Sequence, residues 1–270
     1  MSNNLAIQDK STLLQTAKNL PHALIIEAED GLDYESAVRL LIDNSSLEIT
    51  HIMPLEKKNV ITIEQIRELA TQLRTYAVNR RYIIIHPADS MTESAQNALL
   101  KSLEEPSKTT HFILVAHHHD SLLSTIQSRC QLIKLHQTSP TQDEALLKNT
   151  DLTPQQQQQL LFLAGGRPLL IKKLADSPQT FSEYQQIATD AKQILAAKQS
   201  YKTLVKILSY ASDRQKSQLL IRTLINMIRF QARIRGIDQN LSEQLDKATR
   251  AEAALNANGN IRLALLQLVL

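Results

Sequence analysis

Several residue types that stabilise small or β-rich proteins are scarce in this 270-residue chain. It contains one cysteine, Cys130, together with five glycines and no tryptophan. A single cysteine excludes an internal disulfide framework and a four-cysteine zinc site, and it is typical of a reducing compartment. The low content of glycine, phenylalanine and tyrosine argues against a β-barrel or a β-sandwich.

Long apolar runs are also missing. No stretch approaches the ~20 apolar residues that a membrane-spanning helix needs, and the polar start MSNNLAIQDK lacks the hydrophobic region of a signal peptide. We therefore expect a soluble, cytoplasmic protein without a membrane partner. The net charge of +3 is too small by itself to indicate nucleic-acid binding.

Aliphatic and helix-forming residues are abundant, and 43% of the chain is hydrophobic. The length predicts several domains rather than one compact unit. Apolar runs of strand length alternate with segments of helical periodicity in the first half of the chain, at 23–26, 47–53, 81–85, 111–116 and 131–136. This alternation predicts an α/β domain in which helices cross between the strands of a sheet, and the second half predicts only helices.

Two helix starts in the first half of the sequence carry a capping-box pattern. Ser90 and Glu93 have the S-x-x-E spacing, so we predict a helix from about residue 91 to residue 104 that stops at Pro106. Thr62, with a glutamine three residues later, predicts the start of another helix in the same way. A first, short helix is predicted over 11–20.

Two sequence motifs, SAQNALLKSLEEP and TIQSRC, lie on either side of the strand at 111–116. In this order and spacing they resemble the AAA+ core of bacterial replicative clamp-loader subunits, the delta-prime and gamma/tau proteins of DNA polymerase III. The resemblance implies an AAA+ core with a parallel sheet over 1–137. It also implies a small helical lid domain over 138–178 and a helical collar domain for oligomerisation over 179–270.

The ATP-binding members of this family have a phosphate-binding loop, G-x-x-x-x-G-K-[ST], after their first strand. Its glycines let backbone amides approach the phosphates, while the lysine and the hydroxyl residue serve the phosphates and Mg²⁺. In this chain Ala28 and Asp33 replace the glycines. Tyr34 replaces the lysine and Glu35 the hydroxyl residue, so only Gly31 remains.

Acidic residues gather at the same loop, namely Glu27, Glu29, Asp30, Asp33 and Glu35. They would repel a triphosphate, and acids at the start of the following helix would take the place of a bound anion. We therefore expect no nucleotide and no other cofactor. An ordinary acidic loop between a strand and a helix predicts the same absence of ATP.

The strand at 81–85 is followed by His86, where the active ATPases of the family have acids that hold Mg²⁺. Asp89 comes later and fits a turn or a helix cap, so we predict that hydrolysis is lost as well. The triplet His117-His118-His119 follows the next strand. A metal site there lacks converging ligands, so we predict no metal; the position fits the family's polar sensor loop, and the role of the three histidines stays open.

Two arginines correspond to functional positions of the family. Arg167, in GGRPLLIKKL, resembles the second sensor of the lid domain, although without a nucleotide it fits a helix-start or interface residue better. Arg129, flanked by Ser128 and Cys130, is predicted to act as an arginine finger in trans, on the ATP bound by a neighbouring subunit. The alternative is that Arg129 only pairs with Glu104 or Glu105, or caps carbonyl groups of its own helix.

The end of the chain, NGNIRLALLQLVL, has more apolar residues than a lone surface helix can hide. We expect Ile261, Leu265, Leu268 and Val269 to need either a core or a neighbouring subunit.

These features predict a nucleotide-free, delta-prime-like subunit that has no ATPase activity of its own. Its implied partners are gamma/tau-like ATPase subunits, a delta-like subunit, the sliding clamp and primed DNA. Two alternatives stay open at this point. One is an AAA+ ATPase with an unorthodox site, and the other is a scaffold or nucleic-acid-binding adaptor unrelated to the clamp.

Overall fold

The computed structural model describes most of the chain, as residues 4–42, 48–55, 60–73, 80–105, 109–196, 201–256 and 259–268. Two compact units are present: unit 1 comprises Met1–Thr150 and Gly166–Lys172, and unit 2 comprises Asp151–Gly165 and Lys173–Leu270. The predicted lid, 138–178, is shared between the two units, and the division into three domains stays a prediction.

A parallel sheet forms the centre of unit 1. Its strand order is β2-β3-β4-β1-β5, and every neighbouring pair is parallel. The strands are β1 (Ala23–Glu27), β2 (Glu48–Ile52), β3 (Arg81–Ile85), β4 (Thr110–Ala116) and β5 (Gln131–Lys134). The predicted α/β fold with a parallel sheet is therefore confirmed, and the buried run at 81–85 forms an interior strand.

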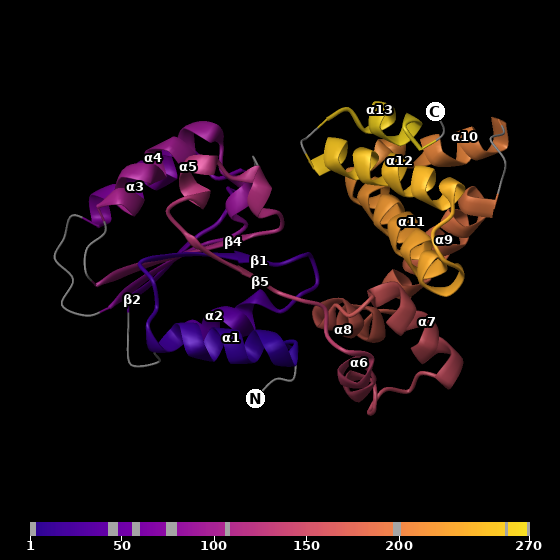
Figure 1. The fold of residues 1–270 in the computed structure, drawn as a ribbon, viewed down its shortest axis with the longest axis horizontal. Helices are drawn as coiled ribbons and strands as arrows, with labels where there is room; N and C mark the ends of the chain where they lie inside the picture. The colour runs from indigo at the N-terminus through magenta and orange to yellow at the C-terminus, as the bar shows by residue number, and fades with distance from the viewer. Residues whose placement is uncertain are drawn as a thin grey trace. The chain divides into compact units, whose positions relative to one another are not determined.

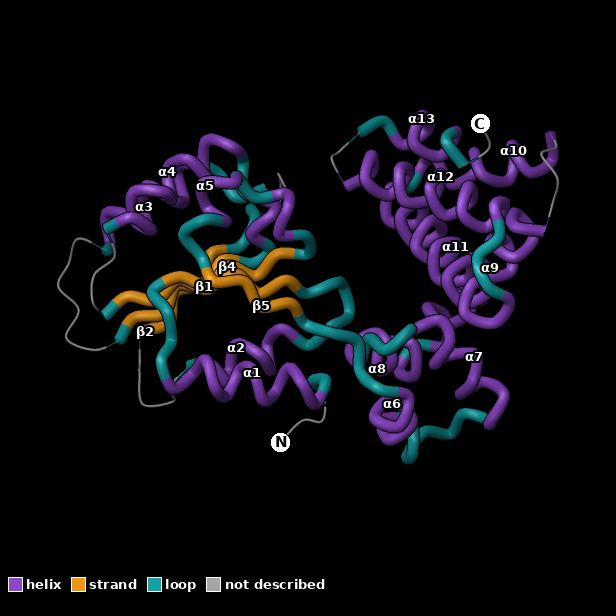
Figure 2. The backbone as a smooth tube through the Cα atoms, in the orientation of Figure 1, coloured by secondary structure: helices purple, strands orange, loops and turns teal. Residues whose placement is uncertain are grey.

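Helices cover both faces of this sheet, as Figures 1 and 2 show. One face carries α1 (Ile7–Lys18) and α2 (Tyr34–Leu41), and the other carries α3 (Ile63–Gln72), α4 (Glu93–Glu104) and α5 (Ser124–Gln127). Successive strand residues point to opposite faces, so Leu24 and Ile26 join the core under α1 and α2, while Ile25 joins the core under α3 and α4.

The local capping predictions have different outcomes. Gln65 Oε1 accepts a hydrogen bond from the Thr62 amide at 3.0 Å, so the predicted start of α3 is confirmed. The predicted pair of Ser90 and Glu93 is wrong. Thr92 caps α4 by accepting from the Ala95 amide at 3.2 Å, because Ser90 lies in a preceding 3₁₀ turn and its hydroxyl donates to the Pro87 carbonyl.

Other predicted boundaries also shift. The first helix begins at Ile7 rather than at residue 11. A 3₁₀ turn, His119–Ser121, precedes the short helix α5. The stop predicted at Pro106 lies outside the described residues.

The rest of the chain is helical wherever it is described. The helices are α6 (Pro140–Leu146), α7 (Pro154–Ala164), α8 (Pro168–Asp176), α9 (Pro178–Ala196), α10 (Tyr201–Leu208), α11 (Arg214–Arg235), α12 (Gln239–Asn256) and α13 (Ile261–Leu266). None of the helices in the described ranges is long and apolar enough to span a membrane.

The last helix completes the core of unit 2. Ala264 and Leu265 of α13 are fully buried with residues of α11 and α12, and Ile261 and Leu268 pack against the same core. Of the two explanations offered for this apolar segment, a core within the chain accounts for these four residues. Val269 lies outside the described residues.

Candidate functional site

Three loops meet at the carboxyl edge of the sheet in unit 1, where open α/β folds generally bind ligands. They follow β1 (residues 28–33), β3 (86–92) and β4 (117–123). The first contains the degenerate phosphate loop, the second the missing acid position, and the third the histidine triplet. The neighbouring strands bring all three sequence-predicted features together.

The side chain of Asp33 caps the start of α2. Asp33 accepts hydrogen bonds from the Ser36 amide at 3.0 Å and from the Ser36 hydroxyl at 2.8 Å, and also from the Asn4 side chain at 2.7 Å. Free amides at a helix start are the groups that bind phosphate in a phosphate loop. Here a buried carboxylate, only 5% exposed, occupies that position.

Gly31, the retained glycine, lies against the start of α8. Its φ of +92° lies in the region that favours glycine, and its carbonyl accepts a hydrogen bond from the Leu169 amide at 3.0 Å. A β-carbon at Gly31 would lie 3.1 Å from the Cβ atoms of Arg167 and Leu170. Arg167 is 6% exposed, so the loop is covered by the residues that begin α8.

This contact joins two features that the sequence predicted separately, the degenerate loop and Arg167. Sequence reasoning missed Asn4, Leu169 and Leu170 as parts of the same region. The one usable signal was Gly31 itself, because a glycine in a loop that lacks the other phosphate-loop residues indicates a backbone or packing requirement.

Tyr34, at the position of the phosphate-loop lysine, is in direct contact with His86, at the position of the magnesium-binding acid. The Tyr34 and His86 rings lie 4.0 Å apart between centroids. Burial, followed by the neighbouring His117, lowers the pKa of His86 to about 4. Burial also raises the pKa of Tyr34, with smaller effects of Glu35 and Asp33. A neutral aromatic pair therefore stands where a lysine and a magnesium-binding acid would be needed.

Two histidines of the triplet are paired with different acids. His117 Nδ1 lies 3.1 Å from Asp89 Oδ2. His119 Nδ1 lies 2.9 Å from Glu27 Oε2, which also pairs with Lys134 at 3.0 Å. Burial alone would raise the pKa of Asp89, but the hydrogen bonds and charge of His117 outweigh it and hold that pKa below its usual value. Among the described residues, no group of three or more potential ligands is placed to hold a metal ion.

The acids of the loop are less available for repulsion than their number indicates. Asp33 and Glu27 have the internal partners described above, and Glu35 pairs with Arg39 of the next helical turn at 3.6 Å. Glu29 and Asp30 are exposed. Three of the five acids are therefore engaged by other groups of the chain.

Arg129 lies two residues after the end of α5, on a different part of unit 1. Its Nη1 donates to the Thr125 carbonyl at 2.8 Å and to the Ser128 hydroxyl at 3.2 Å. Its Nη2 pairs with Glu104 Oε1, at the end of α4, at 2.7 Å. Cys130 is different in character, because burial raises the pKa of its thiol to about 12.

Both interactions that were considered as alternatives for Arg129 are thus present: the Glu104 pair and the carbonyl cap. Neither buries the guanidinium, since the Arg129 side chain is 35% exposed and that of Glu104 48% exposed. Exposed ion pairs of this kind contribute little to stability, typically about 0–1 kcal/mol. The arrangement leaves a positive, partly ordered group at the surface.

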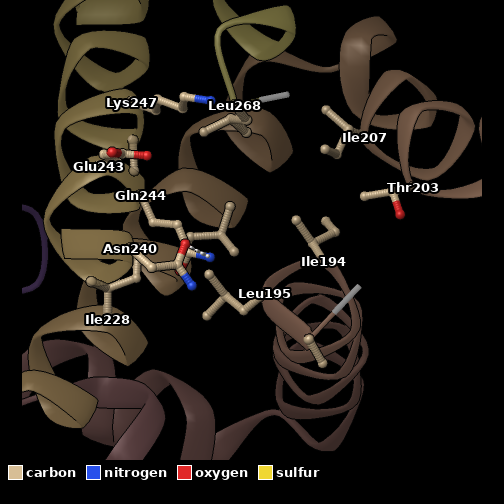
Figure 3. A pocket seen from close by; sticks show the side chains of 13 residues that line it. Ile194, Leu195, Thr203, Ile207, Ile228, Asn240, Glu243, Gln244, Lys247 and Leu268 are labelled. Carbon is tan, nitrogen blue, oxygen red and sulfur yellow. Dashed lines mark hydrogen bonds between the residues drawn. The ribbon is translucent and has the colours of Figure 1, made fainter. Parts of the chain in front are cut away.

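Unit 2 contains a separate cavity of about 340 Å³ between α9, α10, α11 and α12. Figure 3 shows Asn240, Glu243 and Lys247 along α12 on one side, with Ile194 of α9 and Ile207 of α10 opposite. It has no residue in common with the loops at the carboxyl edge of the sheet, and it lies in the segment predicted to be the collar.

Comparison with known proteins agrees with the resemblance carried by the motifs SAQNALLKSLEEP and TIQSRC. The model of the family described as "DNA polymerase III, delta subunit" matches residues 5–139, which is half of the chain. The chain belongs to this family. Within it, the chain is delta-prime-like: it is 33% identical over 142 residues to the DNA polymerase III subunit delta' of Pseudomonas aeruginosa. It is 30% identical over 177 residues to that of Haemophilus influenzae.

These two alignments cover 51% and 55% of this chain but only 43% and 53% of the relatives, so the chain matches about half the length of each. Among solved structures, a DNA polymerase III gamma subunit-related protein from Thermotoga maritima has a TM-score of 0.54 at 19% identity, over 97% of both chains. This likeness concerns the fold, and it confirms the expected AAA+ architecture with additional helices.

Proposed function

We propose that this chain is a clamp-loader subunit of a bacterial DNA polymerase III that neither binds nor hydrolyses ATP and supplies Arg129 to the ATP site of a neighbouring subunit. In the cytoplasm it would help to load the sliding clamp onto primed DNA, with gamma/tau-like ATPase subunits and a delta-like subunit as partners. Membership of the family and the relatives named delta' support the clamp-loader role.

One contrast carries the finer part of the proposal. The loop that would bind a nucleotide is filled by Asp33 and covered by Arg167, both buried, while Arg129 remains at the surface. A guanidinium is always charged and presents its donors in a planar fork that fits phosphate oxygens. It is suited to stabilise charge that develops on a γ-phosphate supplied by another subunit.

The test is Arg129→Ala in the assembled complex. An arginine finger contributes roughly 10³–10⁵ in rate at its own site in GTPases. Other ATP sites dilute this loss, so single-turnover hydrolysis stimulated by clamp and primed DNA is the sharper measurement. We expect a clear loss of hydrolysis and of clamp loading, with assembly unchanged and the melting temperature nearly so, because the Arg129 contacts lie at the surface.

Two further variants control for charge. Arg129→Lys keeps the positive charge but not the fork, and we expect it to restore little activity. Arg39→Ala removes another exposed arginine from an ion pair with a glutamate, and we expect wild-type activity. Full hydrolysis and loading by the assembled Arg129→Ala variant would leave Arg129 a structural residue and refute the proposal.

A further inference from the structure

The guanidinium of Arg129 is held from two different elements. Two contacts, to Thr125 and Ser128, come from its own helical turn, and both use Nη1. The third comes from Glu104 on another helix and uses Nη2, at 2.7 Å. An arginine side chain has five N–H donors. The Nε–H and the second Nη2–H have no partner within the described residues, so they are the donors left for a ligand.

Glu104 lies at the end of helix α4, which is anchored in the core of unit 1. Leu99 and Leu103 of this helix are buried in the core of unit 1. Near the start of the helix, the buried Gln96 accepts a hydrogen bond from the Leu123 amide at 2.8 Å. Gln96 therefore holds the chain just before α5, and Glu104, two helical turns further along α4, holds the residue that follows α5.

We propose that Glu104 is a positioning residue for Arg129: its carboxylate fixes the guanidinium so that the two remaining donors are presented to a phosphate of the neighbouring subunit. This inference rests on the proposed function of Arg129. An exposed pair adds little to folding stability, so we expect its main effect to be the ordering of the arginine side chain. A long arginine side chain loses much rotamer freedom when it binds, and ordering it beforehand removes that cost from the reaction.

A carboxylate beside an arginine could also have the opposite effect on the reaction. It could hold the arginine back, as a substitute for phosphate that must be displaced. The two roles differ in the sign of their effect. Loss of a positioning carboxylate slows hydrolysis, whereas loss of a restraining carboxylate accelerates it. Three contacts from two different elements, which leave two donors without a partner among the described residues, favour positioning.

The experiment compares Glu104→Ala, Glu104→Gln and Glu105→Ala in the complete complex, with kcat and KM for ATP hydrolysis stimulated by clamp and DNA. Glu105→Ala removes the same charge from the next residue, which is exposed. We expect Glu104→Ala to lower kcat by about tenfold with little change in KM, because a displaced catalytic group can cost up to ~10²-fold and two other contacts remain. Glu104→Gln keeps an acceptor of the same shape and should retain most of kcat. Glu105→Ala should match the wild type.

A double variant shows whether Glu104 acts through Arg129. Because coupled residues are not additive, Glu104→Ala should have no further effect once Arg129 is alanine, and melting temperatures should stay near that of the wild type. If Arg129→Ala is impaired but Glu104→Ala behaves as Glu105→Ala, or is faster than the wild type, the positioning role is wrong and the proposed function stands. If Arg129→Ala is fully active, the proposed function itself has failed.

Discussion

The phosphate-loop region, which contains Gly31 and Asp33, and the Arg129 region lie in the same unit but have different surroundings. In the phosphate-loop region, Asp33 and Arg167 are 5% and 6% exposed and Gly31 packs against α8. In the Arg129 region, the side chain is 35% exposed, and two of its donors have no partner among the residues that the structure describes. A nucleotide-binding loop serves its own subunit, whereas an arginine finger serves a neighbour. The two can therefore be lost independently.

Because the two regions differ in burial, substitutions in them should affect different properties, folding stability in one and activity in the other. Substitutions in the phosphate-loop region remove buried contacts and should act mainly on folding. Substitutions in the Arg129 region remove exposed contacts and should act mainly on the assembled enzyme. Three predictions test the first half of this comparison, beginning with the largest expected effect on stability.

Gly31→Ala should destabilise unit 1 by about 2–3 kcal/mol. The positive φ costs about 1 kcal/mol or more for alanine, and its Cβ would be pressed against Arg167 and Leu170 at 3.1 Å, which adds an overpacking cost of about 1–2 kcal/mol. Hydrogen exchange of the β1 amides measures the loss.

Gly165→Ala is the control, because Gly165 also has a positive φ, of +57°, but its added Cβ would meet only Asn226 Nδ2, at 3.9 Å. It should cost only about 1 kcal/mol, measured on the α7 amides. Equal losses at the two glycines would contradict the covering of the phosphate loop by α8.

The Tyr34–His86 contact should make unit 1 less stable at mildly acid pH. The pKa of His86 is lowered from 6.5 to about 4 in the folded chain, so between these values the unfolded chain binds a proton that the folded chain does not. Stability is therefore little affected above pH 6.5 and falls as the pH drops towards 4, with a loss of about 2 kcal/mol by pH 5. Denaturation at pH 7 and pH 5 measures this effect.

His86→Phe is the control for this titration. Phenylalanine can keep the ring contact with Tyr34 but binds no proton, so the fall between pH 7 and pH 5 should be smaller than in the wild type. Asp89 contributes in a lower range, since its depressed pKa gives stability that is present above the ordinary carboxyl pKa and is lost below it. The same pH dependence in both chains would show that His86 is not buried as described.

Features that depend on neighbours in the sequence were predictable. The β-branched run at 81–85 forms β3, and Thr62 starts α3, because strand propensity and capping are decided within a few residues. The Ser90 prediction failed for the same local reason. Ser90 and Thr92 both precede the helix, and the sequence does not show that the first of them forms a 3₁₀ turn with Pro87.

The filling of the phosphate loop was not predictable in detail. Asn4 bonds Asp33, and the start of α8 packs on Gly31, across long stretches of chain. Residue types showed that the loop lacks the lysine and the hydroxyl residue, but only the folded chain shows which groups occupy the start of α2. The identity of the Glu104–Arg129 pair was among the alternatives, because both motifs that contain these residues were recognised.

Substitution of Asp33 separates two explanations for the proposed absence of a nucleotide: repulsion by negative charge, and occupation of the loop by the chain's own groups. Asp33→Ala should cost about 1–2 kcal/mol, because the α2 cap is lost and Asn4 is left without this acceptor. Asp33→Asn keeps an acceptor for the Ser36 amide and should cost less. If occupation by the chain's own groups excludes the nucleotide, neither variant, nor Tyr34→Lys combined with Asp33→Asn, should bind Mg-ATP in a calorimetric titration, since Arg167 and α8 still cover Gly31. Saturable micromolar binding by Asp33→Asn would show that charge alone had excluded the nucleotide. The contacts of Arg167 and α8 with Gly31 would then not be sufficient to prevent binding.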